Sequence, residues 1–133
     1  MFVLEGLLMY LHPESVHATF QEIGRLAGKG SELVFDYVRL PALEHPEQYY
    51  GGKQILQSVA KAGEKWVFGI DEKNIIPFLD QYGLSFMEHK DSVELEKMYF
   101  TDAAGVLAGG RINSTHCLVR AAKQTTTEAA LNS

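Results

Sequence analysis

The chain has 133 residues, 46% hydrophobic and 22% charged, which is the composition of one globular domain or of part of one. Its 12 Lys and Arg are scattered among 17 Asp and Glu, giving a formal net charge of -5, so nucleic-acid binding has no electrostatic support. The single cysteine argues against a disulfide scaffold and against a cysteine-based zinc site. No apolar run is long enough to span a bilayer, and the apolar start lacks the features of a signal peptide. We therefore expect a soluble, cytoplasmic protein without a membrane partner.

The first third of the chain alternates between strand and helix patterns. Residues 2–4 are a short apolar run that is typical of a strand buried on both faces. A helix is predicted to begin at residues 12–15, where a proline and an acidic residue suit the first turn, and to end at residues 28–30. Residues 32–38 are predicted to form a second, mostly buried strand. Strand, helix and strand in this order predict a right-handed βαβ unit.

The middle of the chain has shorter elements. Residues 41–46, with a proline at each end, are predicted to interrupt regular structure, and a helix ending near Gly63 follows. Asp71 can cap another helix, which Pro77 should kink or restart and Gly83 should end.

Two more strand patterns complete the α/β alternation, at residues 84–89 and 115–121. Between them, residues 91–94 have the spacing of a capping box and should begin a short helix, whereas residues 104–110 are predicted to form a flexible glycine-rich turn.

The best candidate site follows the first predicted strand. Ligands of open α/β sheets bind outside the carboxyl ends of the parallel strands, which is where Glu5 and Gly6 fall. Asp36, Tyr37 and Arg39 end the second strand and are expected to face the same crevice, where they would contact a substrate or orient a carboxylate. An ordinary strand-to-loop transition is the alternative explanation for these three residues.

The run at residues 5–11 (EGLLMYL) resembles the segment after the fourth strand in the leucine carboxyl methyltransferase family, which uses S-adenosylmethionine (AdoMet) and has bacterial O-methyltransferase relatives. The resemblance covers the C-terminal half of that family and continues in order through residues 66–71, 78–83, 110–113 and 115–119. It implies a Rossmann-like doubly wound sheet of parallel strands plus a terminal antiparallel strand. It also implies that Glu5 and Gly6 line the AdoMet pocket and that Tyr10 belongs to the substrate pocket. The alternative for Glu5 is a carboxylate that caps the next helix.

The predicted domain is incomplete. A buried strand at residue 2 needs neighbours, and about four strands are fewer than the usual 5–6 of a sheet. The resemblance supplies the rest, an N-terminal half that carries the glycine-rich AdoMet loop and an acidic residue for the ribose. Residues 28–30 and 51–53 do not have the context or spacing of such a loop. We therefore expect residues 1–124 to be the C-terminal part of a single methyltransferase domain, with residues 125–133 as a frayed tail.

The resulting hypothesis is an AdoMet-dependent O-methyltransferase, present as a truncated portion that is inactive alone. Its acceptor is a peptide carboxylate, a polyketide-like acid or a phenolic hydroxyl. The alternative is a non-catalytic remnant or interaction module that associates with itself through its exposed first strand.

Other polar residues carry weaker predictions. The five histidines show no metal-ligand spacing, so no metal site is expected. Cys117 falls in the middle of an apolar strand and is predicted to be buried and inert, and Trp66 to be a packing anchor. Tyr49 and Tyr50 precede two glycines and belong either to a substrate lid or to an exposed helix start.

Overall fold

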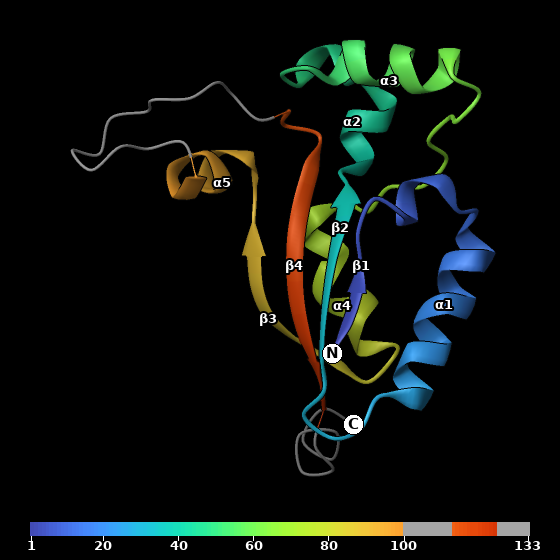
Figure 1. The fold of residues 1–133 in the computed structure, drawn as a ribbon, viewed down its shortest axis with the longest axis vertical. Coiled ribbons are helices and arrows are strands. Elements are labelled where there is room, and N and C mark those ends of the chain that lie inside the picture. The colour runs from blue at the N-terminus through green and yellow to red at the C-terminus, as the bar shows by residue number, and fades with distance from the viewer. Residues whose placement is uncertain (100–112, 125–133) are drawn as a thin grey trace.

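The computed structural model describes residues 1–99 and 113–124, and within these ranges its centre is a four-stranded sheet (Figure 1). In spatial order the strands are β1 (Phe2–Leu4), β2 (Glu32–Val38), β4 (His116–Lys123) and β3 (Leu84–Lys90). β1 and β2 are parallel, and β4 runs antiparallel to both of its neighbours. The predicted α/β class, with parallel strands and a terminal antiparallel strand, is confirmed.

Most helices lie on one face of the sheet or beyond one of its ends, and the last helix, after β3, borders the other face (Figure 1). They are α1 (Pro13–Leu26), α2 (Leu40–Glu44), α3 (Gly52–Lys61), α4 (Ile75–Asp80) and α5 (Ser92–Tyr99), with short 3-10 turns η1 (Leu8–Tyr10), η2 (Pro46–Gln48) and η3 (Glu72–Asn74). α1 links the two parallel strands, and α2 and α3 lie beyond the carboxyl end of β2. Among the described residues, none of the helices combines the length and the apolar character needed to cross a membrane.

One face of the sheet, which we call the packed face, carries the core. Side chains alternate along a strand, and the core residues of β2 and β4 that point to this face are at most 1% exposed: Leu33, Phe35, Tyr37, Cys117, Val119 and Ala121. α1 and α4 cover them. Phe20 of α1 is fully buried, and its ring meets those of Phe35 and Phe78 edge to face at centroid distances of 5.2 and 4.8 Å.

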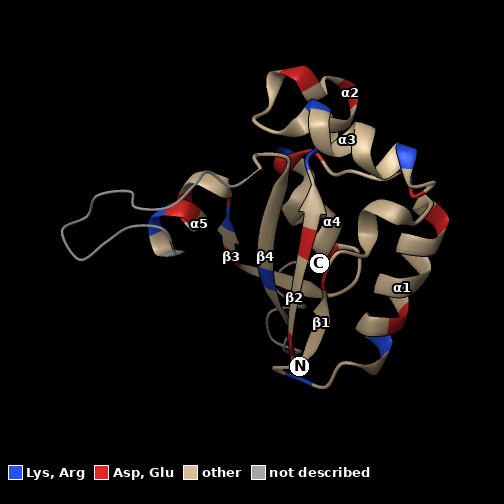
Figure 2. Ribbon diagram, turned by 45° about the horizontal axis from the view of Figure 1, so that its top comes forward, with Lys and Arg blue, Asp and Glu red and all other residues tan. Residues whose placement is uncertain are grey.

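The opposite face, which we call the open face, carries the even-numbered residues of the same strands. Val34, Asp36 and Leu118 are only partly buried there, and α5 contributes Leu95. Charges of both signs are interspersed over the described elements, without a large region of one sign (Figure 2).

The prediction that β1 is buried on both faces is wrong. Phe2 and Leu4 pack against the core, but Val3 points to the open face and is 62% exposed. β1 pairs with β2 along one edge, and no strand of the described ranges pairs with its other edge. β1 is therefore more apolar than expected for a strand with one exposed face.

Most predicted boundaries agree with the structure. The capping box is confirmed, since the Glu94 N–H donates to Asp91 Oδ1 at 2.9 Å and the Asp91 N–H donates to Glu94 Oε1 at 3.3 Å. The predicted interruption at residues 41–46 is wrong, because α2 occupies most of it. Pro41 lies in the first turn of that helix, where a missing N–H costs no helical hydrogen bond. The glycine-rich turn at 104–110 and the tail at 125–133 lie outside the described residues.

Candidate functional site

A cavity of about 340 Å³ lies on the open face, near the carboxyl ends of β1 and β2. Its walls are mostly valine and leucine side chains from β1, β2, β4 and α5. Its ionisable side chains on this face are the carboxylates of Glu5 and Asp36 and the imidazole of His116. A mostly apolar cavity with a few polar groups is the usual form of a small-molecule site.

Asp36 fixes the turn that follows β1. Gly6 has a φ of +59°, a left-handed conformation that favours glycine, and its N–H donates to Asp36 Oδ1 at 2.8 Å. The neighbouring Glu5 is exposed. Neither η1 nor α1 has a side-chain cap hydrogen bond, so the structure does not support Glu5 as a helix cap.

His116 begins β4 and is held in one tautomer. Asn113 Oδ1 accepts from the Thr115 N–H at 2.8 Å and also faces the Thr115 hydroxyl, whose one proton therefore goes to this oxygen. The Thr115 oxygen lies 2.8 Å from His116 Nδ1, and since its own proton goes to Asn113, we assign the proton of the neutral imidazole to Nδ1 as the donor. His116 Nε2 is then left with a free lone pair. Burial lowers the pKa of His116, and the negative charge of Asp36 partly opposes this effect.

Trp66 packs against the same imidazole. The two rings are nearly perpendicular, at 86°, with centroids 5.0 Å apart. Trp66 is 7% exposed and belongs to a small cluster with Met9, Val38 and Ala42, in agreement with its predicted packing role. Its Nε1 has no hydrogen-bond partner among the described residues.

The remaining predicted site residues do not join Glu5 in this cavity. Tyr37 and Arg39 end β2 together with Asp36, but alternation along the strand places their side chains on the packed-face side. Tyr10 lies at a separate hollow that is lined by Gly63, Glu64 and Lys65. Of the three residues expected to face the crevice of Glu5, only Asp36 lines the same cavity as Glu5.

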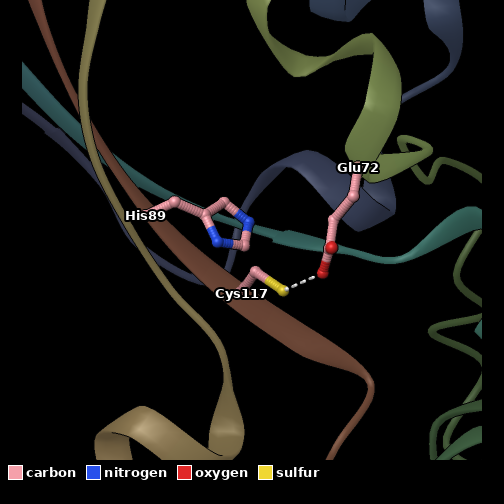
Figure 3. Close-up of side chains that lie close together, drawn as sticks. All are labelled: Glu72, His89 and Cys117. Carbon is pink, nitrogen blue, oxygen red and sulfur yellow. Dashed lines mark hydrogen bonds between the residues drawn. The ribbon is translucent and has the colours of Figure 1, made fainter.

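Tyr37 and Arg39 instead belong to a polar cluster with Glu72, His89 and Cys117. Figure 3 shows the last three side chains pointing toward one another, and their ligand atoms lie within 4.8 Å of each other. Arg39 Nε donates to Cys117 Sγ at 3.1 Å, and Arg39 Nη2 lies 2.8 Å from Glu72 Oε1. Tyr37 Oη pairs with His89 Nε2 at 2.8 Å.

This cluster offers the donor atoms of a metal site, which the sequence did not predict. The Arg39 guanidinium already binds two of the three donors, and a metal ion would have to displace this positive charge. Burial raises the pKa of Cys117 to about 11 despite the Arg39 hydrogen bond, so the thiol stays protonated and unreactive at neutral pH. The hydrogen bonds and the ion pair of this cluster connect β2, β3, β4 and η3, and we interpret the cluster as structural.

Comparison with known proteins supports the fold. No protein-family model matches this chain, and no curated protein does. A solved structure of a SAM-dependent methyltransferase from Methanosarcina mazei matches with a TM-score of 0.54 at 13% sequence identity, covering 92% of this chain and 57% of that chain. At this identity the likeness shows the fold alone. The chain therefore has a class I methyltransferase-like fold and spans 57% of the length of the matched chain.

The residues present fit one side of an AdoMet site. Glu5 and the open backbone of Gly6 stand at the carboxyl end of β1, and a Cβ added at Gly6 would meet no atom within 4 Å. No glycine-rich loop in the described ranges follows a strand and opens a helix, which is the context that such a cofactor loop needs.

Proposed function

We propose that this chain is the C-terminal part of an AdoMet-dependent O-methyltransferase related to the leucine carboxyl and bacterial O-methyltransferases. The observation that carries the proposal is the cavity on the open face, at the carboxyl ends of two parallel strands of a methyltransferase-like sheet. Ligands of such sheets bind at this edge. In this proposal residues 1–124 are the C-terminal part of a single methyltransferase domain.

The chain's own residues take separate roles in this proposal. Glu5 and Gly6 form one wall of the AdoMet pocket, and Asp36 holds the backbone of Gly6 in place through the 2.8 Å hydrogen bond. AdoMet, when bound, supplies an electrophilic methyl group. The valine and leucine walls exclude water from the acceptor oxygen, and alignment of the reacting groups provides much of the rate enhancement.

The test is calorimetric titration with AdoMet of two proteins, the 133-residue chain and the same chain fused to the N-terminal half of a class I methyltransferase. The chain alone should bind weakly or not at all, and the fusion should bind. Low-micromolar binding by the chain alone would contradict its assignment as a partial site. A folded fusion that does not bind AdoMet would contradict the methyltransferase assignment.

A second candidate function is an interaction module that associates with itself through β1. The observation that favours it is the outer edge of β1, with which no strand of the described residues pairs, together with Val3 at 62% exposed, since such an edge is a template for pairing with another chain. Val3→Lys should then abolish concentration-dependent association in light scattering while the melting temperature stays unchanged. A wild-type chain that remains monomeric at every concentration would exclude this function.

A further inference from the structure

We infer that the cavity on the open face selects a small ligand with a neutral hydroxyl group, of the phenol class, over a carboxylate, and that His116 Nε2 accepts the hydrogen bond of that hydroxyl. As a statement about binding, this inference stands without the proposed function. As a statement about the methyl acceptor, the inference rests on the proposed function.

The charge of the described cavity lining favours a neutral ligand over a carboxylate. Among the described residues, its ionisable side chains on the open face are two carboxylates, Glu5 and Asp36, and one imidazole, and its described lining contains no Lys or Arg. Lys90, Arg39 and Arg120, on or beside the neighbouring strands, are paired with carboxylates. Lys90 lies 3.4 Å from Glu88 and 3.8 Å from Glu94. Arg39 binds Glu72 on the packed-face side, and Arg120 lies between Glu32 and Glu88 at 3.1 and 3.3 Å. A carboxylate in the cavity would meet like charges with no compensating partner.

The hydrogen-bond chain of His116 prepares the site for a donor. Asn113 orients the Thr115 hydroxyl, the hydroxyl oxygen accepts from Nδ1–H, and Nε2 is therefore an acceptor. Thr115 is fully buried, so the hydrogen bonds among Asn113, Thr115 and His116 are shielded from competing water. The side chain of Thr115 thus decides which nitrogen of His116 can accept a hydrogen bond from a ligand.

The size and walls of the cavity suit an aromatic ring. A volume of about 340 Å³ is at the lower end of the range of about 300–1,000 Å³ for small-molecule sites. The valine and leucine walls contact the ring, and the hydroxyl reaches His116. If the hydroxyl ionises, its proton passes to Nε2. The resulting imidazolium keeps its hydrogen bond to Thr115 and gains from the negative charge of Asp36.

The test is a pair of NMR titrations of the 133-residue chain, labelled with ¹⁵N-histidine, at pH 8 without AdoMet. The probes are phenol and benzoate, which differ in the group presented to His116. In the free chain the ring nitrogens of His116 should show the Nδ1–H tautomer. Phenol should shift the Nε2 signal and bind at least about tenfold more tightly than benzoate, because only phenol offers a donor.

Two variants and a control complete the experiment. Thr115→Val keeps the shape of the side chain but frees Nδ1, so it should mix the tautomers of His116 and weaken phenol binding. His116→Gln should abolish the preference for phenol. His45→Gln is the control, because His45 is exposed, lies beside Glu47 and is not among the residues that line the cavity. It should change neither result.

Three results would overturn the inference: an Nε2–H tautomer in the free chain, benzoate binding as tight as that of phenol, or no effect of phenol on His116. None of them depends on AdoMet. Failure of the fusion to bind AdoMet would leave the phenol result standing, and equal affinities for the two probes would leave the methyltransferase assignment standing.

Discussion

The two faces of the sheet use the same strands for different purposes. On the packed face, side chains from β2 and β4 are almost completely buried under α1 and α4. The polar cluster that contains Arg39, Glu72 and Cys117 lies at the edge of this face. On the open face, residues one position along the same strands line a cavity with two carboxylates and a histidine. The difference shows that a two-residue period can separate residues that hold the fold from residues that are free to bind a ligand.

The largest expected effect comes from removing the centre of the packed face. Phe20→Ala deletes a fully buried ring that meets two other aromatic rings, and it should lower the free energy of unfolding by about 3–5 kcal/mol. Leu118→Ala on the open face is the matched comparison and should cost much less, because Leu118 is only partly buried. Urea unfolding of both variants measures the contrast. Equal losses would mean that the open face also carries the core.

A smaller effect, on binding rather than folding, is expected at Glu5. In the fusion protein, Glu5→Ala should weaken AdoMet binding roughly ten- to a hundred-fold, the value of a lost hydrogen bond to a charged group. Its melting temperature should stay close to that of the wild type, because Glu5 is exposed and caps no helix. Calorimetry and a thermal melt on the same protein separate the two effects. An affinity within about twofold of wild type would remove Glu5 from the cofactor wall.

Asp36→Ala should lower the free energy of unfolding by a small amount. It removes the acceptor for the Gly6 N–H, and the loss of a side-chain acceptor for a backbone N–H typically costs about 1 kcal/mol. The isolated chain should therefore be destabilised by about that amount in urea, whereas Glu5→Ala should not be. If Asp36→Ala were as stable as wild type, the hydrogen bond would not hold the turn.

The smallest expected effect is a pH dependence from His116. Burial lowers its pKa in the folded state below the ordinary value of 6.5. As the pH falls through 6.5, the unfolded chain takes up a proton that the folded chain does not, so stability decreases toward acid until the lower pKa is passed. His116→Gln should reduce the slope of stability against pH below 6.5. The intrinsic fluorescence of Trp66, the one tryptophan of the chain, reports the same titration because its ring lies 5.0 Å from that of His116. A slope identical to that of wild type would show that His116 is not buried in neutral form.

Local chemistry decided which parts of the fold the sequence could predict. The capping box at residues 91–94 and the Asp71 side chain that accepts from the Lys73 N–H depend only on residues within a few positions. Strand and helix periods likewise indicated most elements and the α/β class. Local signals were insufficient at residues 41–46, where a proline that can end a helix also suits its first turn.

Only the tertiary structure decided which residues meet. β4 inserts between β2 and β3, and this places Cys117 beside Arg39 and Glu72, and His116 beside Asp36 and Trp66. The two partners are 45 or more positions apart in each of these pairs, so no spacing in the chain indicates them. The sequence held one indication for His116. An antiparallel strand begins at the edge of the sheet where its parallel neighbours end, so a polar residue at the start of such a strand lies at the ligand-binding edge. The sequence by itself determined the elements and the residues at their ends, because backbone hydrogen bonding is local. The sheet order decided which of those residues share a cavity, because pairing between strands is not local.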